Sequence, residues 1–217
     1  MVRVTHHLTS IVLTTALAVF PVHAAEDPPS HSPTARVPRP SMSMDQWGYQ
    51  HYDQGVYYRD RALTFEKQLQ AATTDKARHK LSKKIVKNYR LAAGEFEDAL
   101  DLVPTLHQAA AGLGCVLVKT EAFPEALAAC DLALSIEPAN AEAVACRARA
   151  FMGMGQLEDA KDVYEQLFDL DRDRAQELLN AMRVWLDRQN LGPSDVPPSI
   201  LEYFDDWLGE QAAIVGR

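Results

Sequence analysis

The hydrophobic positions of this chain recur at helical intervals over most of its length. Between Ala77 and Val103 an apolar residue returns every three or four positions, with no proline in between. This spacing places the apolar residues on one face of a helix, which Pro104 cannot continue. We therefore expect one long helix of about 28 residues in this part of the chain.

Shorter helical patterns lie on both sides of the long helix. Ordered structure is expected to begin near Trp47, with a first amphipathic helix from Tyr57 to Ala72. Further helices are expected at 107–119, 124–136, 141–153, 157–170 and 173–189, and a last short one begins at Ser199. No segment alternates apolar and polar residues long enough to predict a strand, so the predicted fold class is all-α.

The first residues follow a different pattern. Leu8 to Phe20 is an apolar run of thirteen residues that Pro21 ends, and Val22 and Ala24 supply the small residues that signal peptidases recognise. This pattern predicts a secretory signal peptide over residues 1–24, because the run is too short to span a membrane. A membrane anchor is the alternative interpretation.

The next segment has little that it could bury. Glu26 to Met44 contains five prolines and four serines, which predicts a disordered tether over residues 25–45. With the signal peptide, this organisation favours an exported protein. A bacterial periplasm is the expected location, and secretion is the alternative.

Composition narrows the function further. The 217 residues are 47% hydrophobic, which is enough for one good-sized core, and the net charge of −8 argues against nucleic acid as a partner. The histidines are scattered, there is no CxxC motif, and the GLG and GMG sequences follow helices rather than strands. We therefore expect no catalytic residues, no metal site and no cofactor, and we predict that the chain is not an enzyme.

Two segments of the chain are nearly the same. EAFPEALAACDLALSIEP, residues 121–138, returns 34 positions later as GQLEDAKDVYEQLFDLDR, with Ala126 recurring as Ala160 and Phe123 as Leu157. Small residues are needed where two helices cross closely, and large residues fill the gaps between successive helix pairs. A period of 34 residues therefore indicates stacked helix pairs.

This pattern resembles the tetratricopeptide repeat, and the resemblance implies a short α-solenoid of antiparallel helix pairs. The expected organisation is a helical domain over 46–189, with a partial repeat at 73–106, full repeats at 107–140 and 141–174, and a capping helix at 173–189. A hinge at 190–198 and a C-terminal amphipathic helix at 199–217 follow. That last helix either folds back onto the solenoid, which we favour, or docks into a partner.

The resemblance also implies that the first helix of each unit lines a concave groove for a peptide or protein. The groove candidates are Gln108, Lys119, Glu142, Arg149, Met152, Asn180 and Arg183. Arg149 and Arg183 lie one period apart, and with Asn180 they are expected to bind a carboxylate or an acidic side chain. The alternative is that both arginines pair with acids of the chain itself, such as Glu142 and Glu177.

The cysteines offer one further prediction. Cys115 and Cys146 are 31 residues apart, three short of one period, so on adjacent helices they become near neighbours across the groove. A disulfide is therefore expected in an oxidising compartment, and the alternative is that the cysteines are independent buried residues. Cys130 is expected in the core.

Two charged helical faces complete the picture. The long helix carries a basic stripe opposite its apolar face, and the final helix carries acids. The stripe consists of Lys76, Lys80, Lys83, Lys84, Lys87 and Arg90, and the acids are Glu202, Asp205, Asp206 and Glu210. The stripe is either solvated or bound to an anionic partner or lipid head groups.

Taken together, these features predict a non-catalytic exported adaptor that mediates a protein–protein interaction, with envelope assembly or secretion as candidate processes. The alternative is a binding protein for a small anionic ligand that uses Arg149 and Arg183. Both hypotheses leave the oligomeric state open.

Overall fold

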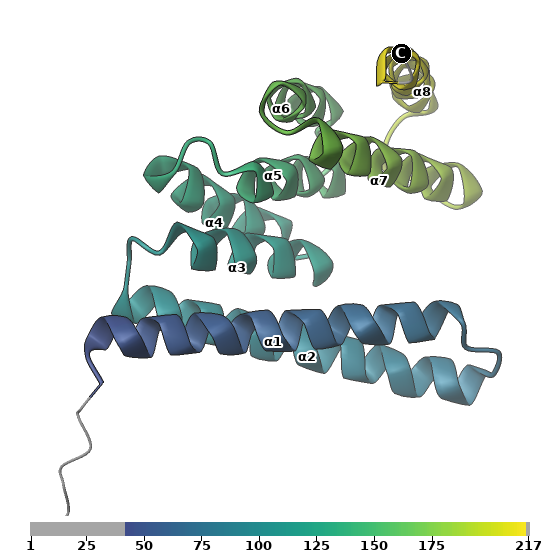
Figure 1. The fold of residues 1–217 in the computed structure, drawn as a ribbon. Helices are drawn as coiled ribbons and strands as arrows, with labels where there is room; N and C mark the ends of the chain where they lie inside the picture. The colour runs from purple at the N-terminus through teal and green to yellow at the C-terminus, as the bar shows by residue number, and fades with distance from the viewer. Residues whose placement is uncertain (1–41, 216–217) are drawn as a thin grey trace, which may run out of the picture. The chain divides into compact units, whose positions relative to one another are not determined.

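Helices account for all regular structure between residues 42 and 215, the part of the chain that the computed structural model describes. The signal peptide predicted at 1–24 and most of the tether predicted at 25–45 lie outside the described residues. The eight helices of Figure 1 are α1 (Met44–Gln70), α2 (Asp75–Leu102), α3 (His107–Lys119), α4 (Phe123–Ile136), α5 (Ala141–Gly153), α6 (Leu157–Leu170), α7 (Arg172–Leu191) and α8 (Pro198–Val215). The predicted all-α fold class is therefore confirmed.

The helices pack as successive pairs. α1 packs along α2, α3 along α4 and α5 along α6, and α7 is followed by α8. The first helices of neighbouring pairs also touch, because α1 contacts α3, α3 contacts α5 and α5 contacts α7. This arrangement is the predicted solenoid of helix pairs, and it places α1, α3, α5 and α7 in one layer. None of the helices between residues 42 and 215 is both long and apolar enough to cross a membrane.

The first helix begins thirteen residues before the predicted start at Tyr57 and includes the last two residues of the predicted tether. Its start is defined by a capping box, in which the Ser43 hydroxyl accepts from the Gln46 backbone and the Gln46 side chain accepts from the Ser43 backbone. Gly48 and Gly55, which weaken a helix locally, are buried in the contact with α2. Tertiary packing therefore extends a helix that local propensity does not predict.

Close contacts between helices depend on glycine at two positions around Phe96, a fully buried ring on α2. A Cβ atom on Gly55 of α1 would lie 2.6 Å from Phe96 Cε1, and one on Gly112 of α3 would lie 2.7 Å from Phe96 Cζ. Gly114 is equally constrained within the first full repeat, because its Cβ would lie 2.5 Å from Cys130 Sγ on α4. The GLG sequence thus serves helix packing, as the sequence analysis expected.

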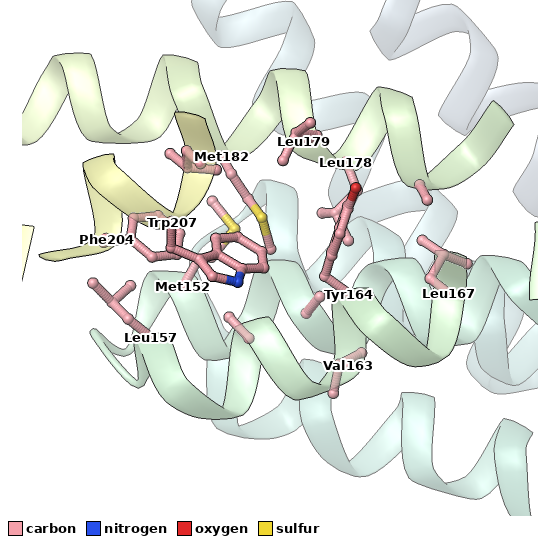
Figure 2. Packing of buried hydrophobic residues seen from close by; sticks show 14 of the residues in the cluster. Met152, Leu157, Val163, Tyr164, Leu167, Leu178, Leu179, Met182, Phe204 and Trp207 are labelled. Atoms are coloured by element: carbon pink, nitrogen blue, oxygen red, sulfur yellow. The ribbon is translucent and has the colours of Figure 1, made fainter. Parts of the chain in front are cut away.

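The C-terminal helix folds back onto the solenoid. Figure 2 shows Phe204 and Trp207 of α8 among core residues of α5, α6 and α7, including Met152, Tyr164 and Met182. The Trp207 ring meets the Tyr164 ring edge-on at a centroid distance of 5.2 Å. α8 therefore covers apolar side chains of α5, α6 and α7, which is the capping role that a solenoid end requires.

Replacing Gly114 by alanine is expected to destabilise the domain by about 1–3 kcal/mol, because the new methyl group overpacks the contact with α4. Gly94→Ala is the matched control, since a Cβ there meets nothing within 4 Å. That substitution lies within α2 and should stabilise the chain by about 0.5–1 kcal/mol. Urea unfolding followed by circular dichroism measures both values, and equal effects of the two substitutions would contradict the packing argument.

Candidate functional site

A cavity of about 380 Å³ opens on the layer of first helices. Residues from all four of these helices line it, together with one from α2: Arg59, Leu63, Tyr89, Cys115, Val116, Lys119, Glu142 and Arg174. Three of these side chains are cations and one is an anion. The cavity therefore combines apolar walls with positive charge, and it occupies the face that the sequence analysis assigned to the groove.

One wall of the cavity is formed by α1, on which no groove residue was predicted. Arg59 Nη1 lies 3.4 Å from Glu142 Oε1, and Glu66 Oε2 lies 2.9 Å from Lys119 Nζ. Glu66 also accepts a hydrogen bond of 2.9 Å from the Tyr89 hydroxyl, and burial, followed by this bond, raises the pKa of Tyr89. Two of the predicted groove residues, Lys119 and Glu142, are thus bound to α1.

The contribution of α1 could have been found from its register. Arg59, Leu63 and Glu66 are spaced by four and three residues, so they share one face of the helix. Arg174 was also missed, because it falls at the boundary between the expected second repeat and the expected capping helix. Its signal is that it lies 34 residues after Asn140, the N-cap of α5, and therefore at the corresponding end of the next unit.

Arg149 lies on α5 two helical turns beyond Glu142 and therefore on the same face. Its side chain is half-buried, and among residues 42–215 it has neither a hydrogen bond nor an ion pair. Burial lowers the pKa of its guanidinium, Arg174 lowers it further, and Glu177 and Glu142 act in the opposite direction. Arg149 does not itself line the cavity, but Arg174 and Glu142, which do, both act on its charge. Because arginine stays protonated, this site holds a partly desolvated cation that interacts with the cavity's charged residues.

Arg183 has an internal partner. Arg183 Nη1 pairs with the Asp205 carboxylate of α8, so this arginine is already paired with an acid of the chain itself. The alternative of an internal partner therefore holds for Arg183, although the acid is Asp205 rather than Glu142 or Glu177. The reason is that α8 folds back beside α7.

The three remaining candidates divide between surface and core. Gln108 is exposed at the start of α3, and Asn180 is exposed on α7, where it accepts a hydrogen bond of 3.3 Å from Gln176. Met152 is only 3% exposed and belongs to the core between α5 and α8, so its assignment to the groove is corrected. Its apolar side chain is used to pack the solenoid end.

A disulfide joins Cys115 of α3 to Cys146 of α5, with Cα atoms 5.2 Å apart. Cys115 also lines the cavity, so the covalent link fixes two of its walls relative to each other. The third cysteine, Cys130, is buried and unbonded. Burial, with a smaller contribution from Asp131, raises the pKa of the Cys130 thiol to about 12, which keeps it in the unreactive protonated form.

A second cluster of polar groups lies between α1 and α2, away from the cavity. His51 Nδ1 is 2.8 Å from Glu95 Oε2 and 3.8 Å from Asp98 Oδ2, and the three ligand atoms lie within 4.8 Å of one another. The sequence analysis missed this grouping because its members come from two helices. We assign no metal to it, since the short contact is a hydrogen bond that joins the helix pair.

The oxidised chain is expected to show no thiol that reacts with Ellman's reagent while folded, one after denaturation and three after denaturation with reduction. Reducing the disulfide should also lower the free energy of unfolding by about 3–4 kcal/mol, the loop-closure value for a 31-residue separation. Cys115→Ser with Cys146→Ser should reproduce this loss, and Cys130→Ala serves as the control that leaves the effect of reduction unchanged. A reactive thiol in the folded chain would contradict the pairing.

Comparison with known proteins finds a family match for one part of the chain. Residues 117–182 match the model of the tetratricopeptide repeat, and no curated protein matches the chain. Similar solved structures include the TPR domain of Arabidopsis OM64, with 13% identity over 59% of this chain and 93% of that one and a TM-score of 0.43.

A second similar structure is the first TPR domain of human RPAP3, with 17% identity over 64% of this chain and 97% of that one and a TM-score of 0.44. A third is the MamA RS-1 ArsTM double mutant, with 16% identity over 77% of this chain and 96% of that one and a TM-score of 0.40. The family match begins at Leu117, inside the first full repeat, includes the second full repeat and ends within the expected capping helix. Residues 117–182 of this chain are therefore similar to the tetratricopeptide repeat.

Proposed function

We propose that this chain is an adaptor that holds an acidic segment of another protein in the cavity on its layer of first helices. Tetratricopeptide repeats are generally non-catalytic scaffolds, and the fold suggests a protein or peptide partner. The observation that carries the proposal is Arg149, a half-buried guanidinium without a hydrogen bond or ion pair among residues 42–215. Its neighbour Arg174 lines the cavity.

The energetics of Arg149 favour an anionic ligand. Removing a charge from water without compensating hydrogen bonds is unfavourable, and a carboxylate restores both charge balance and bonding. A guanidinium binds a carboxylate through two parallel hydrogen bonds, which adds geometric selectivity to the attraction. Arg59 and Lys119 at the cavity already share acids of the chain itself, so Arg149 is the cation that is ready to receive a new partner.

A small anion is the second candidate ligand, because the cavity volume of about 380 Å³ falls within the range of small-molecule sites. In this version Arg149 supplies the charge, since Arg183 is bound to Asp205 and Arg174 to Asp171. α8 does not line the cavity, so no lid from this helix encloses a ligand. An open cavity with cations at its edge suits a peptide that extends beyond it.

Arg149→Glu is expected to weaken binding of a fluorescein-labelled glutamate octamer by at least about tenfold, which fluorescence anisotropy measures directly. The basic stripe of α2 also attracts polyanions, so the matched control is Arg188→Glu, an exposed arginine of α7 with the same charge change. Free glutamate and citrate serve as competitors that test the small-anion alternative.

The comparison of the two variants decides the outcome. Equal weakening by Arg149→Glu and Arg188→Glu would show that only net charge matters and would contradict the cavity as the binding site. Displacement of the octamer by free glutamate at comparable concentration would favour the small-anion alternative. Unfolding curves of both variants confirm that each remains folded.

We further propose that the protein works after export, in an envelope or secretion process. The apolar run from Leu8 to Phe20 and the disulfide between Cys115 and Cys146 support this proposal, because disulfides persist in oxidising compartments. Expressed in a bacterium, the chain should be recovered from the periplasm with Ala25 as its first residue, as mass spectrometry of the N-terminus would show. Leu13→Arg should leave it full-length in the cytoplasm, and an unprocessed wild-type chain would contradict the proposal.

A further inference from the structure

α2 carries a face of positive charge whose residues do not line the cavity. Between Lys76 and Leu91 the sequence contains seven Lys and Arg residues and no acid. We define the basic face as the six exposed members of the predicted stripe: Lys76, Lys80, Lys83, Lys84, Lys87 and Arg90. Among the described residues none of the six pairs with an acid. Lys84 Nζ instead lies 4.8 Å from the centre of the Phe65 ring.

α8 carries the opposite charge on its outer side. Between Asn190 and Val215 the sequence has no Lys or Arg. We define the acidic face as Glu202, Asp206 and Glu210, which are exposed and spaced four residues apart. Asp205 is not part of this face, because it is paired with Arg183.

The two faces match in spacing as well as in sign. Residues four apart on a helix are separated by about 6 Å along its axis. Glu202, Asp206 and Glu210 therefore repeat with the same step as Lys76, Lys80 and Lys84, or as Lys83 and Lys87. Carboxylates and ammonium groups come into register wherever two such helices lie side by side.

Exposed apolar side chains accompany the charges on both helices. Val86 and Leu91 of α2 are 44% and 38% exposed, and Tyr203 and Ile214 of α8 are 54% and 51% exposed. A hollow along α2 is lined by Val86 and Leu91 together with Lys83, Lys87 and Arg90. Apolar contact within a rim of opposite charges is the usual composition of a protein interface.

The fold keeps the two faces apart within one molecule. α2 packs against α1 and α3, whereas α8 packs against α7, and the helices from α3 to α7 separate them in the order of packing. We propose that the basic face of α2 binds the acidic face of α8 in a second copy of this chain. This interaction goes beyond the function proposed for the cavity and does not depend on it.

Binding of the basic face to the acidic face of another copy predicts how copies of the chain assemble and how the association depends on salt. Two copies that exchange both contacts form a closed two-fold dimer, and copies that exchange one contact form an open chain. Exposed ion pairs are individually weak and are screened by salt, so the association is weak and falls as ionic strength rises.

Sedimentation velocity of the full chain tests the proposal, with self-association expected at low salt and lost at about 0.5 M NaCl. Lys83→Glu with Lys87→Glu, and separately Asp206→Lys with Glu210→Lys, should each weaken association at low salt by about tenfold or more. An equimolar mixture of the two double variants should associate again, because the reversed α2 of one meets the reversed α8 of the other. Lys67→Glu with Arg188→Glu is the control for the α2 variant, since it makes the same change in net charge at exposed positions outside both faces.

Three outcomes would overturn the proposal. The first is a chain that is monomeric at both salt concentrations. The second is association that persists in high salt and ignores the charge reversals, as clustering through the apolar Leu8–Phe20 segment would do. The third is a monomer whose basic face binds vesicles of phosphatidylglycerol and phosphatidylcholine and loses that binding on Lys83→Glu with Lys87→Glu, which assigns the face to a lipid surface instead.

Discussion

The close approach of neighbouring helices at glycine and alanine positions is the constraint on which the rest of this structure depends. The Phe96 ring fits between α1 and α3 only because Gly55 and Gly112 have no side chain there. Farther along the stack, Ala111 and Ala143 are fully buried between the repeats. Because first helices meet at such short range, α1, α3, α5 and α7 can share one cavity, and the cysteines of α3 and α5 come within bonding distance.

Much of the fold could be predicted because residues at the helix ends and the apolar period within each helix show where the helices lie. Pro124 lies in the first turn of α4, Asn140 caps α5, and the apolar period fixes the 28 residues of α2. The start of α1 could not be predicted in the same way. Gly48 and Gly55 lower helix propensity, and only the contact with α2 explains why they are there. Where tertiary packing rather than helix propensity determines which residue occupies a position, the sequence pattern alone predicts the wrong helix start.

The candidate site shows the same division. The 34-residue period brought Cys115 and Cys146 together correctly as neighbours, since the positions of Cα atoms follow from the repeat. The partner of Arg183 is Asp205, which lies beyond the loop between α7 and α8, and no period relates those two segments. Arg149 has no such acidic partner among residues 42–215. The 34-residue period thus predicts where the backbone of each helix lies, whereas the partner of a side chain depends on contacts that the period does not determine.

Charge is segregated in this chain, and the segregation matters more than the net value of −8. Cations line the cavity and one face of α2, and acids occupy the outer face of α8. The two cationic surfaces differ in burial and therefore in how strongly salt screens their charges. Arg149 is half-buried and therefore poorly screened, whereas the lysines of α2 are exposed and strongly screened. An acidic ligand held at Arg149 should therefore persist at ionic strengths that release an acidic helix from α2, so one chain can keep a partner bound while it gives up contact with its own copies.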